Sequence, residues 1–313
     1  MAYSSGGLIE ASDYNLLVGG ATANVSGQLN TILATGYGNA GYGQSSVSNV
    51  SVAGSVTATQ WSTLVGSVNL VSKHQNSGYS NLSLYSAGTT INATNNISGA
   101  LTTAYTNRAV KAATGTVVTG TVSTNNLTIP NQTAAASLTF SKTATFASAN
   151  QARYFFNAGG ELRFYVTGYT NTGGTTRGQA FGSLASSGFA GKTFAGTNSS
   201  ARYGSGATLT TDLTGNAGYY RQTSSQLTLT QIDGSTYGAQ YSGDQLLFKS
   251  NTNGAQGSNG DAGTIVKLEV TVTSGSQSPA IADSINCDIS YRLDVAYPST
   301  TFLSNTWGAV TIS

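Results

Sequence analysis

The chain has 313 residues, only 8% of them charged, and a formal net charge of +2 at pH 7. With no Lys/Arg cluster, this balance excludes an electrostatic nucleic-acid surface, and the absence of any run of 18 apolar residues argues against insertion in a membrane. A single cysteine, Cys287, excludes an internal disulfide, and a single histidine, His74, leaves too few ligands for a zinc site built from His and Cys.

Residues 1 to about 114 are predicted to be helical. The first predicted helix covers residues 12–36, where apolar side chains recur every three or four positions, namely at Leu17, Ala21, Val25, Leu29 and Ile32. Ser12 and Asp13 can cap its start, and Gly36 can end it. The internal pair Gly19-Gly20 weakens this prediction, because each glycine costs a helix about 1 kcal/mol relative to alanine.

The strongest helix prediction covers residues 57–75. Thr57 and Gln60 have the spacing of a capping box, in which each side chain satisfies an amide at the helix start. A third, weaker helix is predicted over residues 95–113. Because these apolar faces are narrow, we expect the helices to pack on each other, on the remainder of the chain or on a neighbouring subunit. The candidate attachment residues are Tyr14, Leu17, Trp61, Leu64 and Val68.

From residue 115 to residue 313 the apolar period changes to two. Runs of β-branched and aromatic residues alternate with Gly, Asn and Asp turns at intervals typical of sandwiches. The predicted fold class is therefore mainly β with an N-terminal α-helical region, the C-terminal part being an antiparallel, jelly-roll-like β-sandwich. A Gly/Ser-rich insertion around residues 168–210 separates two groups of strands, and a short helix is expected within it over residues 181–189.

The stretch QARYFFNAGGELRF, residues 151–164, has the densest concentration of charged and aromatic residues in the sequence, with two arginines, one glutamate and four aromatic residues. We predict a β-hairpin here, with Asn157, Gly159 and Gly160 in its turn, since glycine permits the positive φ values of tight hairpins. One hypothesis makes Arg153, Glu161 and Arg163 an anion or sugar-acid site. The preferred hypothesis makes the arginines surface or assembly residues beside a structural turn, because no other residues in the sequence are expected to complete a site with them.

No motif predicts an enzyme. Three aspartates fall within residues 283–294, but their spacing mixes the two faces of a strand, and a single histidine leaves little room for a hydroxyl-His triad. His74 is interpreted as a helix C-terminal residue, with a pH-sensing contact as the alternative, and Cys287 as a small buried apolar residue. The loop of residues 253–263 could bind calcium, although it lacks the terminal glutamate of an EF-hand. We expect no cofactor and no metal.

Several segments, taken in order, resemble a family of tailed-bacteriophage virion structural proteins common in phages of cyanobacteria and marine bacteria. The N-terminal segments are residues 7–20, 33–44 and 56–75, and the later ones are residues 152–164, 251–266 and 297–313. The resemblance covers most of the chain, residues 168–251 being the least similar. It implies a particle component of the tail, baseplate or neck, and it carries over no catalytic residue.

The leading hypothesis is a non-enzymatic tail, baseplate or neck fibre or spike subunit, attached through its N-terminal helices and located in the virion after synthesis in the host cytoplasm. Its expected partners are other virion proteins and further copies of itself, with a trimer as one allowed state and a host-surface glycan as a further candidate. The alternatives are a capsid decoration or tail-wall protein and, less favoured, a polysaccharide-degrading tailspike.

Overall fold

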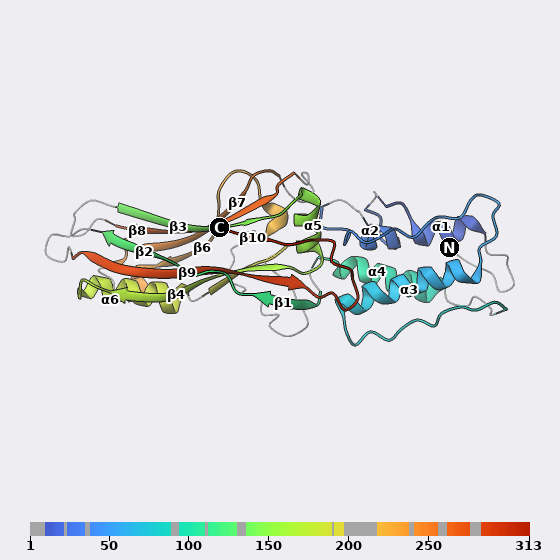
Figure 1. Cartoon of the computed structure of the whole chain (residues 1–313), viewed down its shortest axis with the longest axis horizontal. Coiled ribbons are helices and arrows are strands. Elements are labelled where there is room, and N and C mark those ends of the chain that lie inside the picture. Colours follow the sequence, from blue (N-terminus) through green and yellow to red (C-terminus); the bar gives the residue numbers. More distant parts are fainter. Residues whose placement is uncertain are drawn as a thin grey trace.

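The protein is elongated, with helices at one end and two β-sheets at the other (Figure 1). This computed structural model describes residues 10–21, 24–34, 38–88, 94–109, 112–129, 136–189, 191–196, 218–237, 241–255, 262–275 and 283–313. The predicted fold class is confirmed: the chain is mainly β, both sheets are antiparallel, and the N-terminal part is helical.

Among its described residues, the N-terminal region contains four helices, α1 (Ala11–Val18), α2 (Leu29–Leu33), α3 (Ala58–Gln75) and α4 (Thr94–Asn107). The single helix predicted over residues 12–36 is wrong. Gly19 ends α1 with a φ of +69°, and a Cβ there would lie 2.3 Å from the side chain of Gln28, so the chain turns at this glycine. Val25, expected on the apolar face, is 43% exposed.

Helix α3 begins as predicted. Thr57 Oγ1 accepts a hydrogen bond from Gln60 N at 3.2 Å, and Gln60 Oε1 accepts one from Thr57 N at 2.8 Å. This reciprocal pair satisfies two of the amides that a helix start leaves without a partner. Helix α4 is also confirmed, although it ends at Asn107, six residues before the predicted boundary at residue 113.

Two extended segments beside the helices are held by asparagine side chains. In each case the asparagine Oδ1 accepts from a backbone N–H and its Nδ2 donates to the carbonyl of the same residue, at 2.7–2.9 Å. The pairs are Asn15 with Val50, Asn30 with Val47, and Asn69 with Leu82. The amide thus supplies the donor and acceptor that a neighbouring strand would supply, which accounts for ordered backbone without regular secondary structure.

In the β region the described strands form two five-stranded antiparallel sheets. In the first, β1 (Thr114–Val118) and β2 (Ser123–Ile129) both pair with the long strand β9 (Ile285–Pro298), which is followed by β4 (Glu161–Asn171) and β5 (Gly191–Phe194). The second has the order β10 (Thr311–Ile312), β3 (Ala136–Thr145), β8 (Ile265–Ser274), β7 (Gln245–Thr252) and β6 (Leu227–Asp233).

Aromatic side chains join the two sheets. Phe140 of β3 lies 4.7 Å from Tyr291 of β9 and 6.4 Å from Phe164 of β4, measured between ring centroids. Phe164 in turn lies 5.9 Å from Phe248 of β7. These contacts between opposing sheets define a sandwich core, in agreement with the alternating pattern of the sequence.

Short helices cover the ends of the sandwich. Helix α5 (Ala149–Asn157) lies at the junction with the helical region, and α6 (Thr176–Ser183) continues into a π-helix, Leu184–Phe189. The helix predicted over residues 181–189 is therefore present and begins five residues earlier. Two 3₁₀ turns, Tyr219–Arg221 and Gly234–Tyr237, complete the described elements. Residues 256–261 of the loop considered for calcium lie outside the described residues.

Candidate functional site

The predicted attachment residues are brought together, but inside the helical region. Tyr14, Leu17, Trp61, Leu64 and Val68 are each no more than 3% exposed. The Trp61 ring lies edge-on to Tyr14 at 5.4 Å, between ring centroids, and to Tyr85 at 6.3 Å. Of the three partners expected for these apolar faces, the structure shows the chain itself, because the helices pack on each other and the extended segments between them close over the faces.

Other apolar side chains of the helical region face solvent. Leu16 of α1 is 46% exposed, Leu70 of α3 is 45% exposed, and Leu84 in the segment after α3 is 61% exposed. Sequence reasoning missed them because Leu16 and Leu70 fall off the helical apolar spacing. These side chains are therefore accessible for contact with another protein.

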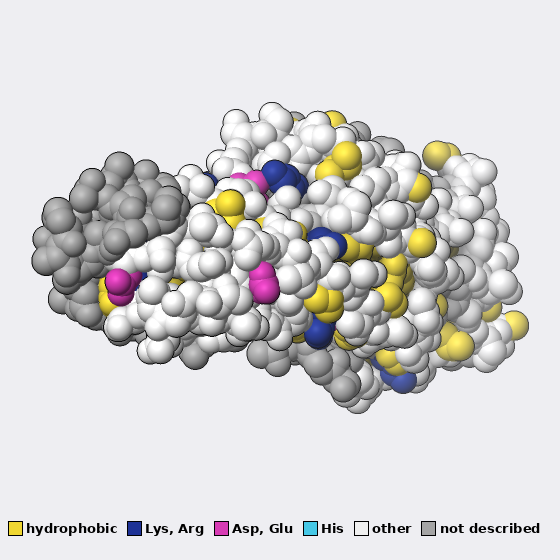
Figure 2. Space-filling view, turned by 60° about the vertical axis from the view of Figure 1, so that its left-hand side comes forward, with side chains coloured by type: hydrophobic (Ala, Val, Ile, Leu, Met, Phe, Trp, Pro, Cys, Tyr) yellow, Lys and Arg dark blue, Asp and Glu magenta, His cyan; other side chains and the backbone are white. Residues whose placement is uncertain are grey.

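Few charges accompany these residues. Figure 2 shows one face of the molecule, on which only scattered charged side chains interrupt a neutral surface. On the helices, several threonine hydroxyls donate to the carbonyl of the preceding turn: Thr63 to Thr59 O and Thr102 to Ser98 O, both at 2.9 Å. Such a surface offers neutral polar and apolar contacts rather than ion pairs.

The predicted hairpin at residues 151–164 is wrong. Its first half is helix α5, which begins at the N-cap Ser148, whose Oγ accepts from Gln151 N at 3.2 Å. The turn residues instead connect α5 to β4: Gly159 has a φ of +100°, and a Cβ on Gly160 would lie 2.5 Å from the ring of Phe155. Both glycines are required, but by a tight helix-to-strand turn.

Asn157, the other predicted turn residue, joins the two regions of the molecule. Its Nδ2 lies within hydrogen-bond distance of three carbonyl oxygens of the helical region, those of Gly38, Ala40 and Gly41, at 2.8–3.1 Å. Its Oδ1 accepts from the hydroxyl of Tyr220 at 2.6 Å. A single buried amide at the end of α5 thus contacts both the N-terminal region and the sandwich side.

Further polar contacts strengthen this junction. Arg153 Nη1 donates to Ala40 O at 2.7 Å, and His74 Nε2 lies 2.9 Å from Ala158 O. His74 is fully buried near the end of α3, where its ring contacts that of Tyr42 edge-on. Buried polar groups are costly unless they are hydrogen-bonded, so these contacts specify one arrangement of the two regions.

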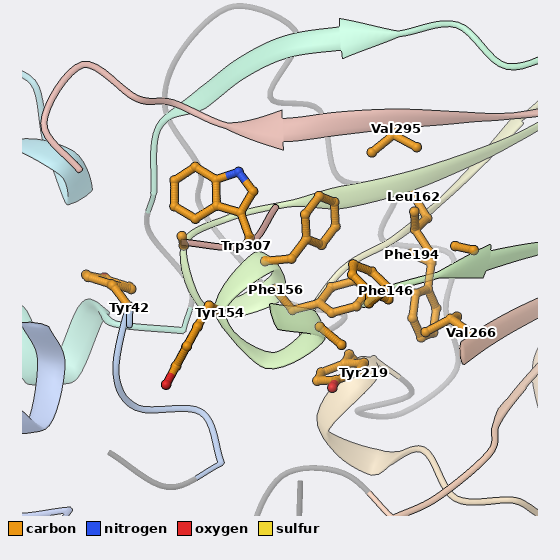
Figure 3. Close-up of a cluster of buried hydrophobic side chains, with 14 of the residues drawn as sticks. Tyr42, Phe146, Tyr154, Phe156, Leu162, Phe194, Tyr219, Val266, Val295 and Trp307 are labelled. Carbon is orange, nitrogen blue, oxygen red and sulfur yellow. The ribbon is translucent and has the colours of Figure 1, made fainter. Parts of the chain in front are cut away.

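An aromatic cluster fills the sandwich side of the junction (Figure 3). Phe156 stacks on Tyr219 at 4.1 Å and lies edge-on to Phe194 at 5.8 Å, between ring centroids. Trp307, near the C-terminus, is 1% exposed within the same cluster. The C-terminal segment is also tied to the helical region, because Thr306 Oγ1 donates to Tyr42 O at 2.7 Å.

Arg153, Glu161 and Arg163 do not form a common site. Glu161 and Arg163 form a buried ion pair at 2.8 Å on β4, whereas Arg153 points into the helical region. Both arginines are at least 90% buried, so their predicted place on the surface is also wrong. The reason is that each guanidinium is paired or hydrogen-bonded within the fold, where a charged side chain can be tolerated.

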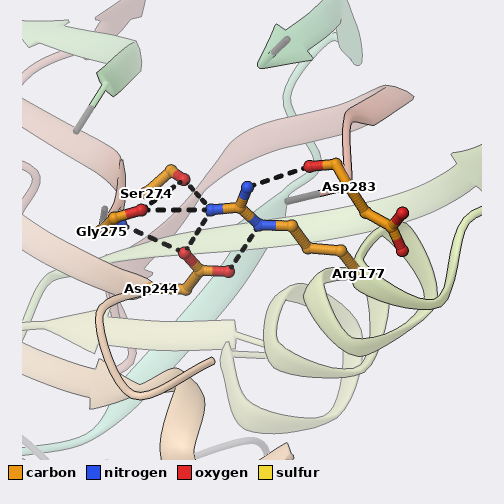
Figure 4. Close-up of polar contacts among 5 residues, drawn as sticks. All are labelled: Arg177, Asp244, Ser274, Gly275 and Asp283. Carbon is orange, nitrogen blue, oxygen red and sulfur yellow. Dashed lines mark hydrogen bonds and ion pairs between the residues drawn. The ribbon is translucent and has the colours of Figure 1, made fainter. Parts of the chain in front are cut away.

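Sequence reasoning missed a buried arginine at the far end of the sandwich (Figure 4). Arg177 of α6 is fully buried; its Nη2 lies 2.9 Å from Asp244 Oδ1, and its Nε donates to Asp244 Oδ2 at 3.2 Å. The same guanidinium contacts Ser274 Oγ and donates to Asp283 O at 3.0 Å. It therefore ties the insertion to both sheets, and its sequence signal is weak, since it is one of three basic residues in the Gly/Ser-rich insertion.

Several of the described carboxylates are held in structural contacts. Asp288 accepts from Asn126 Nδ2 at 3.1 Å, and Asp294 accepts from Arg292 Nε at 2.9 Å. Burial raises the pKa of Glu269, but hydrogen bonds from Lys267, Gln226 and Thr271 and the charge of Lys267 outweigh it, so the pKa lies below its usual value.

Cys287 lies buried on β9, as the sequence predicts. Burial raises the pKa of its thiol to about 11, against a partial lowering by a hydrogen bond with Tyr169. A thiol with so high a pKa is almost entirely protonated at neutral pH, and the thiolate is the reactive form. Among the described residues, no group of three or more His, Cys, Asp and Glu side chains is placed to hold a metal ion.

Comparison with protein-family models, with curated proteins and with solved structures found no match for this chain. Within the described residues, none of the helices has the length and apolar character needed to cross a membrane.

Proposed function

We propose that the chain is a non-enzymatic structural subunit of a bacteriophage virion, a fibre or spike of the tail, baseplate or neck that attaches through its N-terminal helical region. The observation that carries the proposal is the elongated shape, in which a helical module and a β-sandwich are fixed end to end by a buried polar junction (Figure 1). A fibre or spike subunit that is attached at one end and projects its other end from the particle needs such a fixed arrangement of its two regions. The resemblance of the ordered sequence segments supplies the virion context.

The exposed apolar residues of the helical region are the proposed attachment contacts, in place of the buried Trp61 and its neighbours. Leu16, Leu70 and Leu84 can each lose further solvent-exposed area on contact with another subunit. Such burial contributes about 25 cal/mol per Å². Because the surface carries few charges, the proposed contacts include self-association as a homo-oligomer with little dependence on salt.

Incorporation into particles tests this proposal. In a phage that encodes the chain, a variant with Leu16→Asp, Leu70→Asp and Leu84→Asp should fold but be missing from purified particles. Leu227→Asp is the matched control, because Leu227 is an exposed leucine (37%) on β6 of the sandwich. Particles that carry the triple variant at the normal level would refute attachment through these side chains, and virions that lack the unmodified protein would refute the function itself.

A further inference from the structure

A hollow opens at the junction, where the sandwich meets the C-terminal segment. Its volume is about 590 Å³, within the range of about 300–1,000 Å³ that small-molecule sites occupy. Three segments line it: the start of β1 (residues 114–116), the end of β9 with the residues after it (residues 297–301), and residues 305 and 307–309. The wall therefore combines segments far apart in the sequence.

Among the described residues, those that line the hollow include no charged side chain. Threonine and serine hydroxyls, an asparagine amide and backbone groups line it together with Tyr297, Pro298, Trp307 and Ala309, so these described residues offer hydrogen-bonding and apolar contacts but no cation for an anionic ligand. Thr116 and Thr300 are both exposed, and among the described residues their hydroxyls take part in no hydrogen bond. Each hydroxyl can both donate and accept.

Two further side chains have donors left over after their contacts within the fold. Thr301 Oγ1 accepts from Ser299 Oγ at 3.0 Å, which leaves its own proton free to donate. Asn305 Oδ1 accepts from Gly308 N at 2.9 Å, so its side-chain amide is oriented while its N–H groups make no other hydrogen bond among the described residues.

The backbone around the hollow is fixed. The hydroxyl of Tyr297 accepts from Val310 N at 2.9 Å, which ties the end of β9 to the C-terminal segment, and Ser299 N donates to Ala113 O at 3.1 Å. Because the wall is already ordered before binding, less conformational entropy is lost when a ligand binds.

We propose that this hollow is a binding site for a neutral saccharide. Adjacent sugar hydroxyls act as both donors and acceptors, which matches a wall of hydroxyls and an oriented amide without charge. A phosphorylated or acidic sugar would lose hydration of its charge without gaining a cation. The inference rests on the wall of the hollow alone and is independent of the subunit's place in a particle.

Saturation-transfer NMR on the full-length chain tests the site. The neutral probes are cellobiose, maltose, lactose and N,N′-diacetylchitobiose, and the charged comparators are glucose 6-phosphate and 3′-sialyllactose. We expect saturation of at least one neutral disaccharide and none of the charged comparators. Removing both free hydroxyls with Thr116→Val and Thr300→Val should weaken binding by more than about tenfold, since a neutral hydrogen bond contributes about 1 kcal/mol, or roughly fivefold.

Thr103→Val is the matched control, because Thr103 is an exposed threonine on α4, outside the hollow. Its binding should equal that of the unmodified chain. Ala309→Trp, which places a large ring at the exposed rim, should abolish binding without touching a hydroxyl. Absence of binding for all four neutral disaccharides would overturn the proposal, as would binding that survives both Ala309→Trp and the double threonine variant.

Discussion

Replacing Trp61 with alanine tests how the helical region is stabilised. Trp61 is fully buried and contacts the rings of Tyr14 and Tyr85. Truncating a buried tryptophan costs about 3–5 kcal/mol. The indole N–H, however, is buried and donates no hydrogen bond among the described residues, and removing such a group recovers about 1–3 kcal/mol. We therefore expect Trp61→Ala to lower the free energy of unfolding by about 2 kcal/mol, the difference between the midpoints of these two ranges.

Urea unfolding followed by circular dichroism measures this loss. Trp61→Phe is the control: it keeps an aromatic ring and removes the unpaired N–H, so its loss should stay below about 1.5 kcal/mol. Trp307, the other tryptophan of the chain, then reports on the junction by fluorescence. A loss below about 1 kcal/mol for Trp61→Ala would refute the conclusion that this side chain anchors the helical core.

Three further predictions concern the sandwich. Arg177→Met should cost about 3–5 kcal/mol of unfolding free energy in urea titrations, because it removes a fully buried guanidinium and leaves the buried Asp244 carboxylate without its ion-pair partner. Arg292→Met should cost less, because the Arg292 side chain is 30% exposed and Asp294 keeps a hydrogen bond from Gly120 N at 2.9 Å; equal losses would contradict this difference. Because the pKa of Glu269 is lower in the folded protein, its carboxylate stabilises the fold above its unfolded pKa, and this stabilisation is lost as the pH falls through its folded pKa. Glu269→Gln should therefore lower the free energy of unfolding at pH 7 and have no such effect in strong acid. A destabilisation that is the same at every pH would contradict this prediction. Cys287 should resist alkylation by iodoacetamide at pH 7 until the protein is unfolded, because its buried thiol has a pKa of about 11; rapid labelling of the folded protein would contradict the burial of this side chain.

Much of the fold could be predicted from local patterns. The capping box at Thr57 marks the start of α3, and the change from a helical period to a period of two marks the passage from helices to strands. The first helix failed because Gly19 acts as a helix end through its positive φ, and the later apolar positions Leu29 and Ile32 belong to a separate helix, α2. The predicted hairpin failed because Phe155 and Phe156 are both buried, which a one-sided strand does not allow and which α5 achieves by packing into the junction.

The polar contacts could be predicted less well, since they depend on tertiary structure. Arg177 and Asp244 are 67 residues apart in the sequence, and no local period connects them. Asn157 lies in the segment chosen from the sequence, but its partners are backbone carbonyls near residue 40, which carry no sequence signal. For the buried attachment candidates, periodicity identified the shared apolar face correctly. It could not tell whether the chain itself or a neighbouring subunit covers that face.

The mass of the full-length protein in solution, measured by light scattering at low and high salt, decides whether the chain associates as a fibre or spike subunit should. A fibre or spike subunit that associates through neutral and apolar contacts should form a stable homo-oligomer, with three times the chain mass of 31.8 kDa for a trimer, and its mass should not change with salt. A monomer at every protein concentration would contradict the fibre account and favour a decoration or wall subunit that is ordered only by the particle.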